Sequence, residues 1–389
     1  MSATGHVLIA PDKFKGSLTA SAVAGHLATG LARAIPGIAT RQVPVADGGD
    51  GTLDAALAAG FSRVPSRVTG PTGLPVDAAY AERDGVAVVE LAKASGLGQL
   101  PGRALDPLWA TSYGTGELVR AALDRGCHRV VLGLGGSACT DGGAGMLQAL
   151  GMRLRDSRGH ELSRGGAALA ELDHIDATGL RSHLDTAEIV VASDVDNPLL
   201  GPNGAAEVYG PQKGADPDQV ARLGRALARW AEVLHRDLGP VADRATEPSA
   251  GAAGGVGFAA MAALHATVRP GIDYLLELVG FPTQLAGASV VLTGEGSLDK
   301  QTLRGKAPAG VAAVARRAGI PVIAVAGRCL LAGTELAEGG FATVYTLGDI
   351  EPDPARCHAE AGPLLERLAA ERLARDPLVP VTSEAQGAR

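Results

Sequence analysis

The sequence GLGGSACTDGGAG, residues 133–145, follows directly on an apolar run, VVL at 130–132. A strand that ends in a glycine-rich loop leaves backbone N–H groups unshielded by side chains. A helix predicted over residues 144–150 would point its positive end back at this loop. The stretch therefore predicts a strand, an anion-binding loop and a helix, which together form one unit of an α/β fold.

Three further glycine-rich stretches carry charged residues. They are PDKFKGSL at 11–18, ADGGDGT at 46–52 and TGEGSLDKQTLRGKAP at 293–308. Loops that combine glycine, lysine and carboxylates on an α/β pattern suit a phosphate-bearing ligand. With the first loop, they predict one site for a polyanion.

Length and composition limit the classes of protein to consider. A chain of 389 residues favours two domains. Its hydrophobic share is 46% but its aromatic share only 3%, which suits a core of Ala, Val and Leu between buried parallel strands and helices. A net charge of −7, with no basic run, argues against a nucleic-acid partner.

Cysteine use and hydropathy point to an intracellular setting. The four cysteines have no paired metal-ligand spacing and are too few to staple a chain of this length, so we expect reduced thiols. No apolar run approaches the roughly 18 residues of a membrane helix, and the N-terminus enters a short strand without a charged-then-apolar leader. We expect a cytoplasmic protein with no membrane partner.

The hydrophobic pattern alternates between strands and helices at both ends of the chain. Strands are predicted at residues 6–10, 41–45, 129–132, 188–192, 289–292, 321–326 and 342–347. Helices are predicted at residues 20–35, 53–59, 113–125, 144–150, 216–235, 256–264, 307–318 and 363–375. Residues 61–91 alternate in short runs that indicate antiparallel strands, and residues 151–185 look polar and irregular.

Matching α/β blocks at the two ends, with a differently patterned middle, predict a discontinuous domain. Residues 1–66 and 286–375 would close one parallel sheet. Residues 67–285 would form an inserted α/β domain with a mixed sheet. The polar residues 376–389, with two prolines, would be a loose tail.

The central loop also approaches a dinucleotide-binding fingerprint, G-x-G-x-x-A at Gly133, Gly135 and Ala138. An NAD-dependent hydroxyacid dehydrogenase is therefore one alternative. The fingerprint normally runs straight into a helix, whereas residues 139–143 intervene here. There is no P-loop, so ATP would bind without one, and G-x-S-x-G and H-E-x-x-H are absent.

Phosphoryl transfer needs donors on the phosphates, carboxylates for Mg²⁺ and an acceptor for the hydroxyl proton. Lys15, at a strand-to-helix turn, could meet a phosphate or carboxylate, or could be a solvated loop lysine. Asp194 and Asp196 follow a buried strand, where open α/β sheets place their sites. Asp196 could equally cap the turn before Pro198.

Other carboxylates follow the remaining loops. Glu295 and Asp299 could hold metal, although Glu295 could instead cap a helix. Asp47 and Asp50 could bind substrate hydroxyls, although Asp50 is as good an N-cap. Asp12 is a second base candidate after the first strand, and Cys139 is interpreted as a small packed residue rather than a nucleophile.

Lysine is scarce among the 35 basic residues, and all six lysines lie in or beside glycine-bearing stretches. Because lysine and arginine differ in geometry and hydration, this placement favours a role for the set. For Lys93 alone, chance is the preferred interpretation.

Taken in order, the motifs resemble those of the bacterial type I glycerate kinases over residues 6 to about 375. They are PDKFKGSL, VADGGDGT, SYGTGEL, LGGSACTDGGAGMLQALG, ASDVDNPLLGPNGAAEVYGPQKGA, GAAGGVGFA, LTGEGSLDKQT and GKAPAGVA. The resemblance implies ATP- and Mg²⁺-dependent phosphorylation of D-glycerate, usually to 2-phosphoglycerate. It also implies a Rossmann/flavodoxin-like parallel-sheet domain interrupted by a second α/β domain, with the site in the cleft.

The functional residues of that family carry over to Lys15, Ser17, Asp47, Gly135, Gly136, Ser137, Asp194, Lys213, Glu295 and Lys306. This sequence departs from the family at Lys13, where Ser is expected, and at Asp50, where Glu is usual. It also has Cys139-Thr140 where the loop varies, and Ser297 where Arg is common, which removes a possible phosphate contact.

Chemistry then suggests a role for each position. Asp194, as the base, and Lys15 are predicted to be catalytic. Substrate would be bound by Asp12, Ser17, Asp47 and Lys213. Nucleotide would be bound by Gly135, Gly136, Ser137, Gly294 and Lys306. Mg²⁺ would be held by Glu295, Asp299 and Asp196. Besides the dehydrogenase, a non-catalytic sugar-acid-binding protein is the other alternative.

Overall fold

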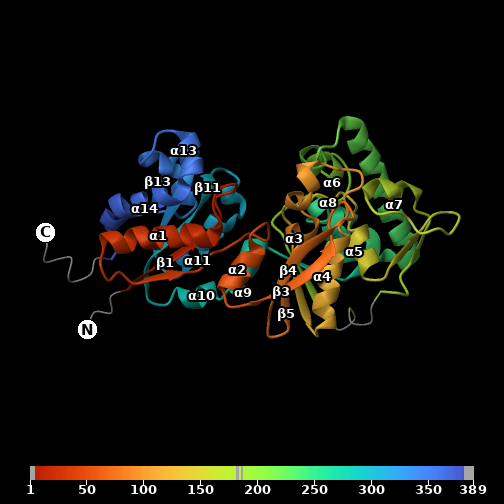
Figure 1. The fold of residues 1–389 in the computed structure, drawn as a ribbon, viewed down its shortest axis with the longest axis horizontal. Helices are drawn as coiled ribbons and strands as arrows, with labels where there is room; N and C mark the ends of the chain where they lie inside the picture. Colours follow the sequence, from red (N-terminus) through yellow and green to blue (C-terminus); the bar gives the residue numbers. More distant parts are fainter. Residues whose placement is uncertain (1–4, 181–183, 185–186, 381–389) are drawn as a thin grey trace. The chain divides into compact units, whose positions relative to one another are not determined.

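A computed structural model describes residues 5–180, 184 and 187–380 of the chain (Figure 1). It divides into two compact units. Unit 1 comprises Met1–Asp47, Asp54–Gly60 and Ile272–Arg389, and unit 2 comprises Gly48–Leu53 and Phe61–Gly271. Each unit contains its own sheet, so the chain is a two-unit α/β protein.

The sheet of unit 1 has five strands in the order β13-β12-β11-β1-β2, and every pair is parallel. Its strands are β1 (His6–Pro11), β2 (Thr40–Gln42), β11 (Ala288–Leu298), β12 (Val322–Cys329) and β13 (Thr343–Thr346). Numbered within this unit alone, the spatial order is 2-1-3-4-5, which is the flavodoxin-like order. In such sheets the strand order reverses between the first and third strands, here β1 and β11, and ligands bind at that switch point.

Helices cover both faces of this sheet because its strands are apolar on both sides. Val7 and Ile9 of β1 pack in one core cluster with α1 (Ala20–Ala34) and α14 (Ala361–Glu371), which lie side by side in Figure 1. Leu8 and Ala10 pack in the other cluster with α9 (Gly271–Leu278) and α11 (Ala307–Arg317). The remaining helices of this unit are α2 (Thr52–Ala58), which begins in unit 2, α10 (Phe281–Gln284), α12 (Gly333–Glu338) and α13 (Pro354–Ala359).

The main sheet of unit 2 has six strands in the order β10-β9-β6-β5-β4-β3. They are β3 (Ser62–Thr69), β4 (Pro75–Arg83), β5 (Val86–Glu90), β6 (Arg129–Gly133), β9 (Glu188–Ala192) and β10 (Thr267–Arg269). The pairs from β5 to β10 are parallel, whereas β3, β4 and β5 pair antiparallel, so the sheet is mixed. A small second sheet pairs β7 (Arg153–Arg155) with β8 (His174–Asp176).

The helices of unit 2 share one large apolar core with its sheet. They are α3 (Ala92–Ser95), α4 (Tyr113–Asp124), α5 (Ala144–Ala149), α6 (Ala205–Tyr209), α7 (Pro217–Leu238) and α8 (Ala252–Ala263). As the sequence predicts, β6 leads through the loop at 134–143 into α5. Alanine, valine and leucine make up most of this core, in keeping with the low aromatic content.

The predicted α/β class with one parallel and one mixed sheet is confirmed, and several element predictions need correction. Residues 151–185 are not wholly irregular, because they hold β7 and β8. The strand predicted at 289–292 continues to Leu298, since its neighbour β12 pairs with it along that length. The sequence pattern gave no sign of α9 or β10.

The ends of the predicted domains can be compared with the two units. Residues 48–53 and 61–66 group with unit 2 rather than with the N-terminal block, and residues 272–285 group with unit 1. The predicted loose tail starts too early. Asp376 and Val379 are buried, and Asp376 accepts a hydrogen bond from the Tyr345 hydroxyl at 2.9 Å. The rest of that tail, residues 381–389, lies outside the described residues.

Two further expectations concern helices and thiols. Across residues 5–180, 184 and 187–380, no helix combines the length and apolar character needed to cross a membrane. Cys127, Cys139, Cys329 and Cys357 are all free thiols, as expected.

Candidate active site

In unit 1, the candidate residues gather where β1 and β11 lie side by side at the switch point. Asp12 follows β1 directly, and its N–H donates to the Gly294 carbonyl of β11 at 2.8 Å. Its side chain is buried, and this desolvation raises its pKa to about 7, although the nearby Lys13 ammonium opposes the shift. The carboxylates of Asp47 and Glu295 lie close enough to raise that pKa further. Asp12 is therefore a carboxyl group able to exchange a proton near neutral pH.

Glu295 lies within β11 rather than in a loop after it. Its carboxylate accepts a hydrogen bond from the Thr302 hydroxyl at 2.6 Å, and the Lys306 ammonium is 3.9 Å away. Burial raises the pKa of Glu295, while Thr302 and Lys306 counteract the rise. Glu295, predicted to hold metal, and Lys306, predicted to bind nucleotide, are thus brought together.

Gly294 has a structural reason to be glycine. A Cβ at this position would lie 1.8 Å from the Val325 carbonyl oxygen of β12, so a side chain would separate the two strands. Gly294 is buried inside the sheet. Its predicted part in nucleotide binding therefore has no support from exposure, and close strand packing accounts for the residue.

Lys15 and Ser17 lie in the turn between β1 and α1. The Lys15 side chain is exposed, which leaves it accessible to an anionic ligand. The Ser17 hydroxyl donates to the His358 carbonyl at 2.8 Å and so anchors the turn to α13. The predicted contact of Ser17 with substrate would need this bond to be exchanged.

The three predicted metal ligands are divided between the two units. Glu295 and Asp299 belong to unit 1, whereas Asp196 belongs to unit 2. Asp299 accepts a hydrogen bond from the Gln301 N–H at 2.8 Å, which stabilises a turn. Among the residues that the structure describes, no group of three or more His, Cys, Asp or Glu side chains is arranged to hold a metal ion.

Position 297, where serine stands in place of the arginine common in the family, has a guanidinium beside it. Arg328 of β12 pairs with Ser297 in the sheet register, and its Nε donates to the Ser297 hydroxyl at 3.1 Å. Arg328 is exposed. A positive charge therefore lies next to the position where the resemblance leads us to expect an arginine.

In unit 2, the glycine-rich loop is shaped by close backbone packing. A Cβ on Gly135 would lie 2.4 Å from Gly49 Cα, and Gly136 has a φ of 73°, which disfavours other residues. Gly136 is exposed, Gly135 is partly exposed and Ser137 is buried. The exposed glycine backbone is the part of the loop that a phosphate could reach.

The helix that follows this loop does not offer the free N-terminus that the sequence predicts. Asp141, which is fully buried, accepts hydrogen bonds from the N–H groups of Gly143 at 3.1 Å and Gly145 at 3.2 Å. It also accepts from the Ser112 N–H and hydroxyl at 2.8 and 2.9 Å. A carboxylate of the chain already occupies the start of α5, so an anion at the loop would have to use residues 134–137 instead.

Asp194 stands just beyond the carboxyl end of β9, as predicted. It is exposed, and its Oδ1 accepts from the Gly271 N–H at 2.8 Å, where α9 begins. Asp196 is also exposed. The Gly271 N–H therefore helps to fix the position of the Asp194 carboxylate.

The sequence predicts that Lys213 binds substrate. Its side chain is buried and its ammonium donates to the Cys139 carbonyl in the glycine-rich loop. Burial lowers the pKa of Lys213, while Cys139 and Asp141 oppose the shift. Lys213 therefore supports the glycine-rich loop from its buried side. Cys139 is buried, and burial raises the pKa of its thiol, consistent with a packed residue.

Glu90 is a buried carboxyl group at a strand end that the sequence reasoning missed. It is the last residue of β5 and is 0% exposed, and burial raises its pKa to about 7. The signal was present, because a glutamate closes the apolar run VAVV at 86–89. A charge directly at the end of a buried strand could have been added to the candidates.

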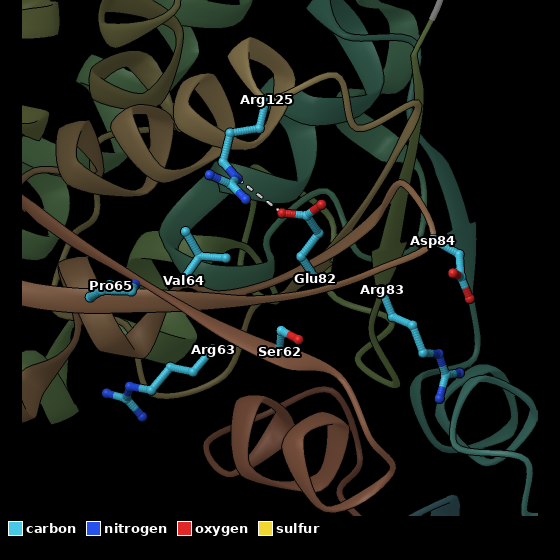
Figure 2. A pocket seen from close by; sticks show the side chains of 8 residues that line it. All are labelled: Ser62, Arg63, Val64, Pro65, Glu82, Arg83, Asp84 and Arg125. Atoms are coloured by element: carbon cyan, nitrogen blue, oxygen red, sulfur yellow. Dashed lines mark hydrogen bonds and ion pairs between the residues drawn. The ribbon is translucent and has the colours of Figure 1, made fainter.

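A pocket of about 510 Å³ lies at the opposite end of this sheet (Figure 2). It is lined by the start of β3 and the end of β4, including Ser62, Glu82 and Arg83. The strand register places it at the amino end of the parallel strand β5, away from Glu90. The Nε of Arg125 lies 3.0 Å from the Glu82 carboxylate. Figure 2 shows Arg63 and Arg83 pointing away from each other. These side chains do not converge on a ligand.

Comparison with known proteins gives a consistent result. A sequence profile of the Glycerate kinase family matches residues 7–376. Glycerate kinase of Bacillus subtilis (strain 168) is 47% identical over 324 residues, which cover 82% of this chain and 84% of that protein. Glycerate 2-kinase of Escherichia coli (strain K12) is 45% identical over 325 residues, again 82% of this chain and 84% of that protein.

A solved structure agrees with these relatives. A chain from Salmonella typhimurium LT2, whose structure carries the name glycerate kinase 2, matches with a TM-score of 0.81 and 42% sequence identity. The match covers 95% of this chain and 97% of that one. The protein therefore belongs to the glycerate kinase family and is a kinase.

Proposed function

We propose that this kinase transfers the γ-phosphoryl group of ATP to the 2-hydroxyl of D-glycerate. The observation that carries the proposal is the group of carboxylates and lysines around Asp12 and Glu295 at the switch point of the parallel sheet. The name of the Escherichia coli relative, glycerate 2-kinase, supports the 2-phosphoglycerate product. The dehydrogenase and the non-catalytic sensor are set aside, because the family is one of kinases.

Glycerate carries a carboxylate and two hydroxyl groups, so its site needs both cationic and hydrogen-bonding groups. We assign Lys15, which is exposed, to the carboxylate. Asp12 and Asp47 are assigned to the hydroxyl groups, since carboxylates accept hydrogen bonds from them. Ser17 stays a weaker candidate because its hydroxyl is bonded to His358.

In unit 2, the glycine-rich loop is assigned to the phosphates of ATP. In unit 1, Lys306 is assigned to phosphate. Gly135 and Gly136 leave backbone unshielded by side chains, which is the usual reason for glycine at a phosphate. Ser137 adds a hydroxyl. Lys306 supplies a compact positive charge of the kind that binds phosphate.

Within unit 1, Glu295 and Asp299 are assigned to Mg²⁺. Mg²⁺ is usually held by one or two carboxylates together with water and substrate phosphates. Glu295, with Asp299 four residues away, satisfies this requirement without a protein cage. When bound, the ion would neutralise charge on the phosphate oxygens.

Asp194 is assigned as the acceptor of the glycerate hydroxyl proton. One of its oxygens is fixed by the Gly271 N–H and the side chain is exposed. A substitution by asparagine keeps an oxygen that can accept that bond but removes the basic carboxylate. We expect Asp194→Asn to lower kcat by roughly 10²- to 10⁴-fold, with KM for D-glycerate changed only a few-fold.

The experiment is an ADP-release assay with ATP, D-glycerate and Mg²⁺, with and without a chelator, and with the product identified by ³¹P NMR. Asp84→Asn, at the β4–β5 turn, is the matched control and should retain wild-type kcat. No ADP release by the wild-type protein would refute D-glycerate as substrate. A 3-phosphoglycerate spectrum would refute the position, and an unchanged kcat in Asp194→Asn would refute the base.

A further inference from the structure

Glu90 makes contacts that a mere core residue would not make. Both the Gly51 N–H, at 3.2 Å, and the Leu53 N–H, at 2.9 Å, donate to its Oε2. Gly51 and Leu53 belong to Gly48–Leu53, a segment that groups with unit 2 although the chain on either side of it groups with unit 1. One carboxylate oxygen thus fastens this segment to the end of β5.

The same segment fits against two more strand ends. A Cβ on Gly48 would lie 2.5 Å from the Ala192 carbonyl oxygen at the end of β9. A Cβ on Gly133, at the end of β6, would lie 2.8 Å from the Gly48 carbonyl oxygen. Gly135 of the proposed phosphate loop approaches Gly49 as closely. Because these contacts are backbone to backbone, a small shift of the segment would displace the glycine-rich loop.

The other oxygen of Glu90 is left for a different partner. Oε1 is buried and accepts no hydrogen bond from the described residues, but the Lys93 ammonium lies 3.5 Å away. Lys93 is partly exposed, and Asp50 also acts on Glu90 electrostatically. The hydrogen bonds to the segment and the charge pair with Lys93 therefore use separate oxygens.

We propose that Glu90 is a positioning residue, which docks segment 48–53 on the ends of β5, β6 and β9 and so sets the glycine-rich loop for phosphoryl transfer. The inference rests on the proposed function for its kinetic part. Lys93, which the sequence led us to attribute to chance, is the ionic partner of this carboxyl group. What the segment needs from position 90 is an acceptor at the correct reach rather than a negative charge.

Three substitutions separate reach from charge. Glu90→Gln keeps an oxygen at the same distance and loses the charge. Glu90→Asp keeps the charge but is one methylene shorter, and Glu90→Ala removes both. Because burying N–H groups without an acceptor is unfavourable, amide exchange near Gly51 and Leu53 should accelerate roughly tenfold to hundredfold in Glu90→Asp and Glu90→Ala.

The primary readout is hydrogen–deuterium exchange of peptides covering residues 46–58, which needs no enzymatic activity. We expect wild-type protection in Glu90→Gln and the loss just given in the other two variants. In the kinetic assay, kcat/KM for ATP should fall by roughly tenfold or more in Glu90→Asp and stay within about threefold of wild type in Glu90→Gln. Glu82→Gln, on β4 of the same sheet, should change neither measurement.

Each outcome tests a different part of the proposal. Equal losses in Glu90→Gln and Glu90→Asp would overturn the claim that reach matters, and wild-type exchange in Glu90→Asp would overturn the docking role itself. If Glu90→Ala does not fold, the comparison of the Gln and Asp variants still decides. If the wild-type protein fails to phosphorylate D-glycerate, the proposed function fails while the exchange data still test the docking.

Discussion

Asp12 and Glu90 are both buried carboxyl groups at carboxyl ends of parallel strands, one in each unit. Desolvation raises both pKa values to about 7. Each also has a lysine ammonium nearby, Lys13 at 3.7 Å and Lys93 at 3.5 Å. Near neutral pH each carboxyl group is divided between its charged and neutral forms, so its environment decides which form dominates.

Glu90 should therefore make stability depend on pH. Burial raises its pKa from 4.5 to about 7, so between these values the folded protein holds a proton that the unfolded chain has released. Stability then falls as pH rises from about 4.5 to 7 and stays low above that range. We expect Glu90→Gln to remove this slope. The difference in free energy of unfolding between Glu90→Gln and wild type should then be larger at pH 8 than at pH 4, by at most about 3 kcal/mol in favour of the variant.

The measurement is urea unfolding of wild type and Glu90→Gln at several pH values. Lys93 and Asp50 are charged groups that act on Glu90 electrostatically. Asp50→Asn therefore serves as the control, and its stability should keep most of the dependence on pH. Parallel pH curves for wild type and Glu90→Gln would contradict the shifted pKa.

Individual site residues were predictable where a motif placed them directly at a strand end. Asp12 and Asp194 follow β1 and β9 as the sequence indicates. The bond from the Lys213 ammonium to the Cys139 carbonyl was not predictable, because a glycine motif does not reveal that its lysine turns inward. Glu90 was missed because it lies outside every glycine-rich stretch.

At the scale of the helix, α1 carries two glycines with opposite surroundings. A Cβ on Gly30 would lie 2.3 Å from the Glu366 carbonyl oxygen of α14, whereas nothing lies within 4 Å of a Cβ on Gly25. We expect Gly30→Ala to destabilise the protein by about 1–3 kcal/mol through overpacking. Gly25→Ala should stabilise it by about 0.5–1 kcal/mol through helix propensity.

Thermal and urea unfolding of the two variants would check this pair. Because both changes add the same methyl group to one helix, propensity alone would give them the same sign. Two stabilising substitutions would mean that α1 and α14 do not pack as closely as described.

Elements with long apolar runs were the predictable ones. Strands β1, β6 and β9 and helices α1 and α7 appear close to their predicted bounds, because burial of one face or both leaves a regular pattern. Strands β7 and β8 have three residues each and a mostly polar sequence, too little for a pattern. Asp141, at the start of α5, also accepts a hydrogen bond from Ser112, which is distant in sequence, and no local signal predicts that contact.

At the scale of the molecule, the two units have separate apolar cores and differ in their tryptophan content. Both tryptophans, Trp109 and Trp230, lie in unit 2. Tryptophan fluorescence should therefore follow unfolding of unit 2, whereas circular dichroism follows both units. We expect Gly30→Ala, in unit 1, to lower the midpoint seen by circular dichroism and to leave the fluorescence midpoint within error.

An equal shift in both signals would show that the units unfold as one cooperative system. Trp230→Phe provides the control, because fluorescence should then come from Trp109 alone and still report unit 2. The Trp230 indole N–H donates to the Gly142 carbonyl at 3.0 Å, so the Trp230→Phe control is expected to lose some stability in unit 2.

The two-sheet α/β organisation followed from the sequence because each end of the chain repeats the same alternation. The assignment of residues 48–53 to unit 2 did not, because six residues inside an N-terminal α/β block carry no compositional signal. Their placement depends on Glu90, Gly133 and Ala192, whose contacts with them exist only after the sheet has formed.

The pairing of β1 with β11 has a consequence for how the protein is made. Val7 of β1 pairs with Val290 of β11, so β1 leaves the ribosome about 280 residues before this one of its two neighbours. At 5–20 residues per second, that interval lasts roughly 15 to 60 s. Unit 2 is synthesised complete within it, including the strand ends that receive residues 48–53. During translation, all residues of unit 2 therefore precede β11, and until β11 emerges β1 has only β2 as a strand partner.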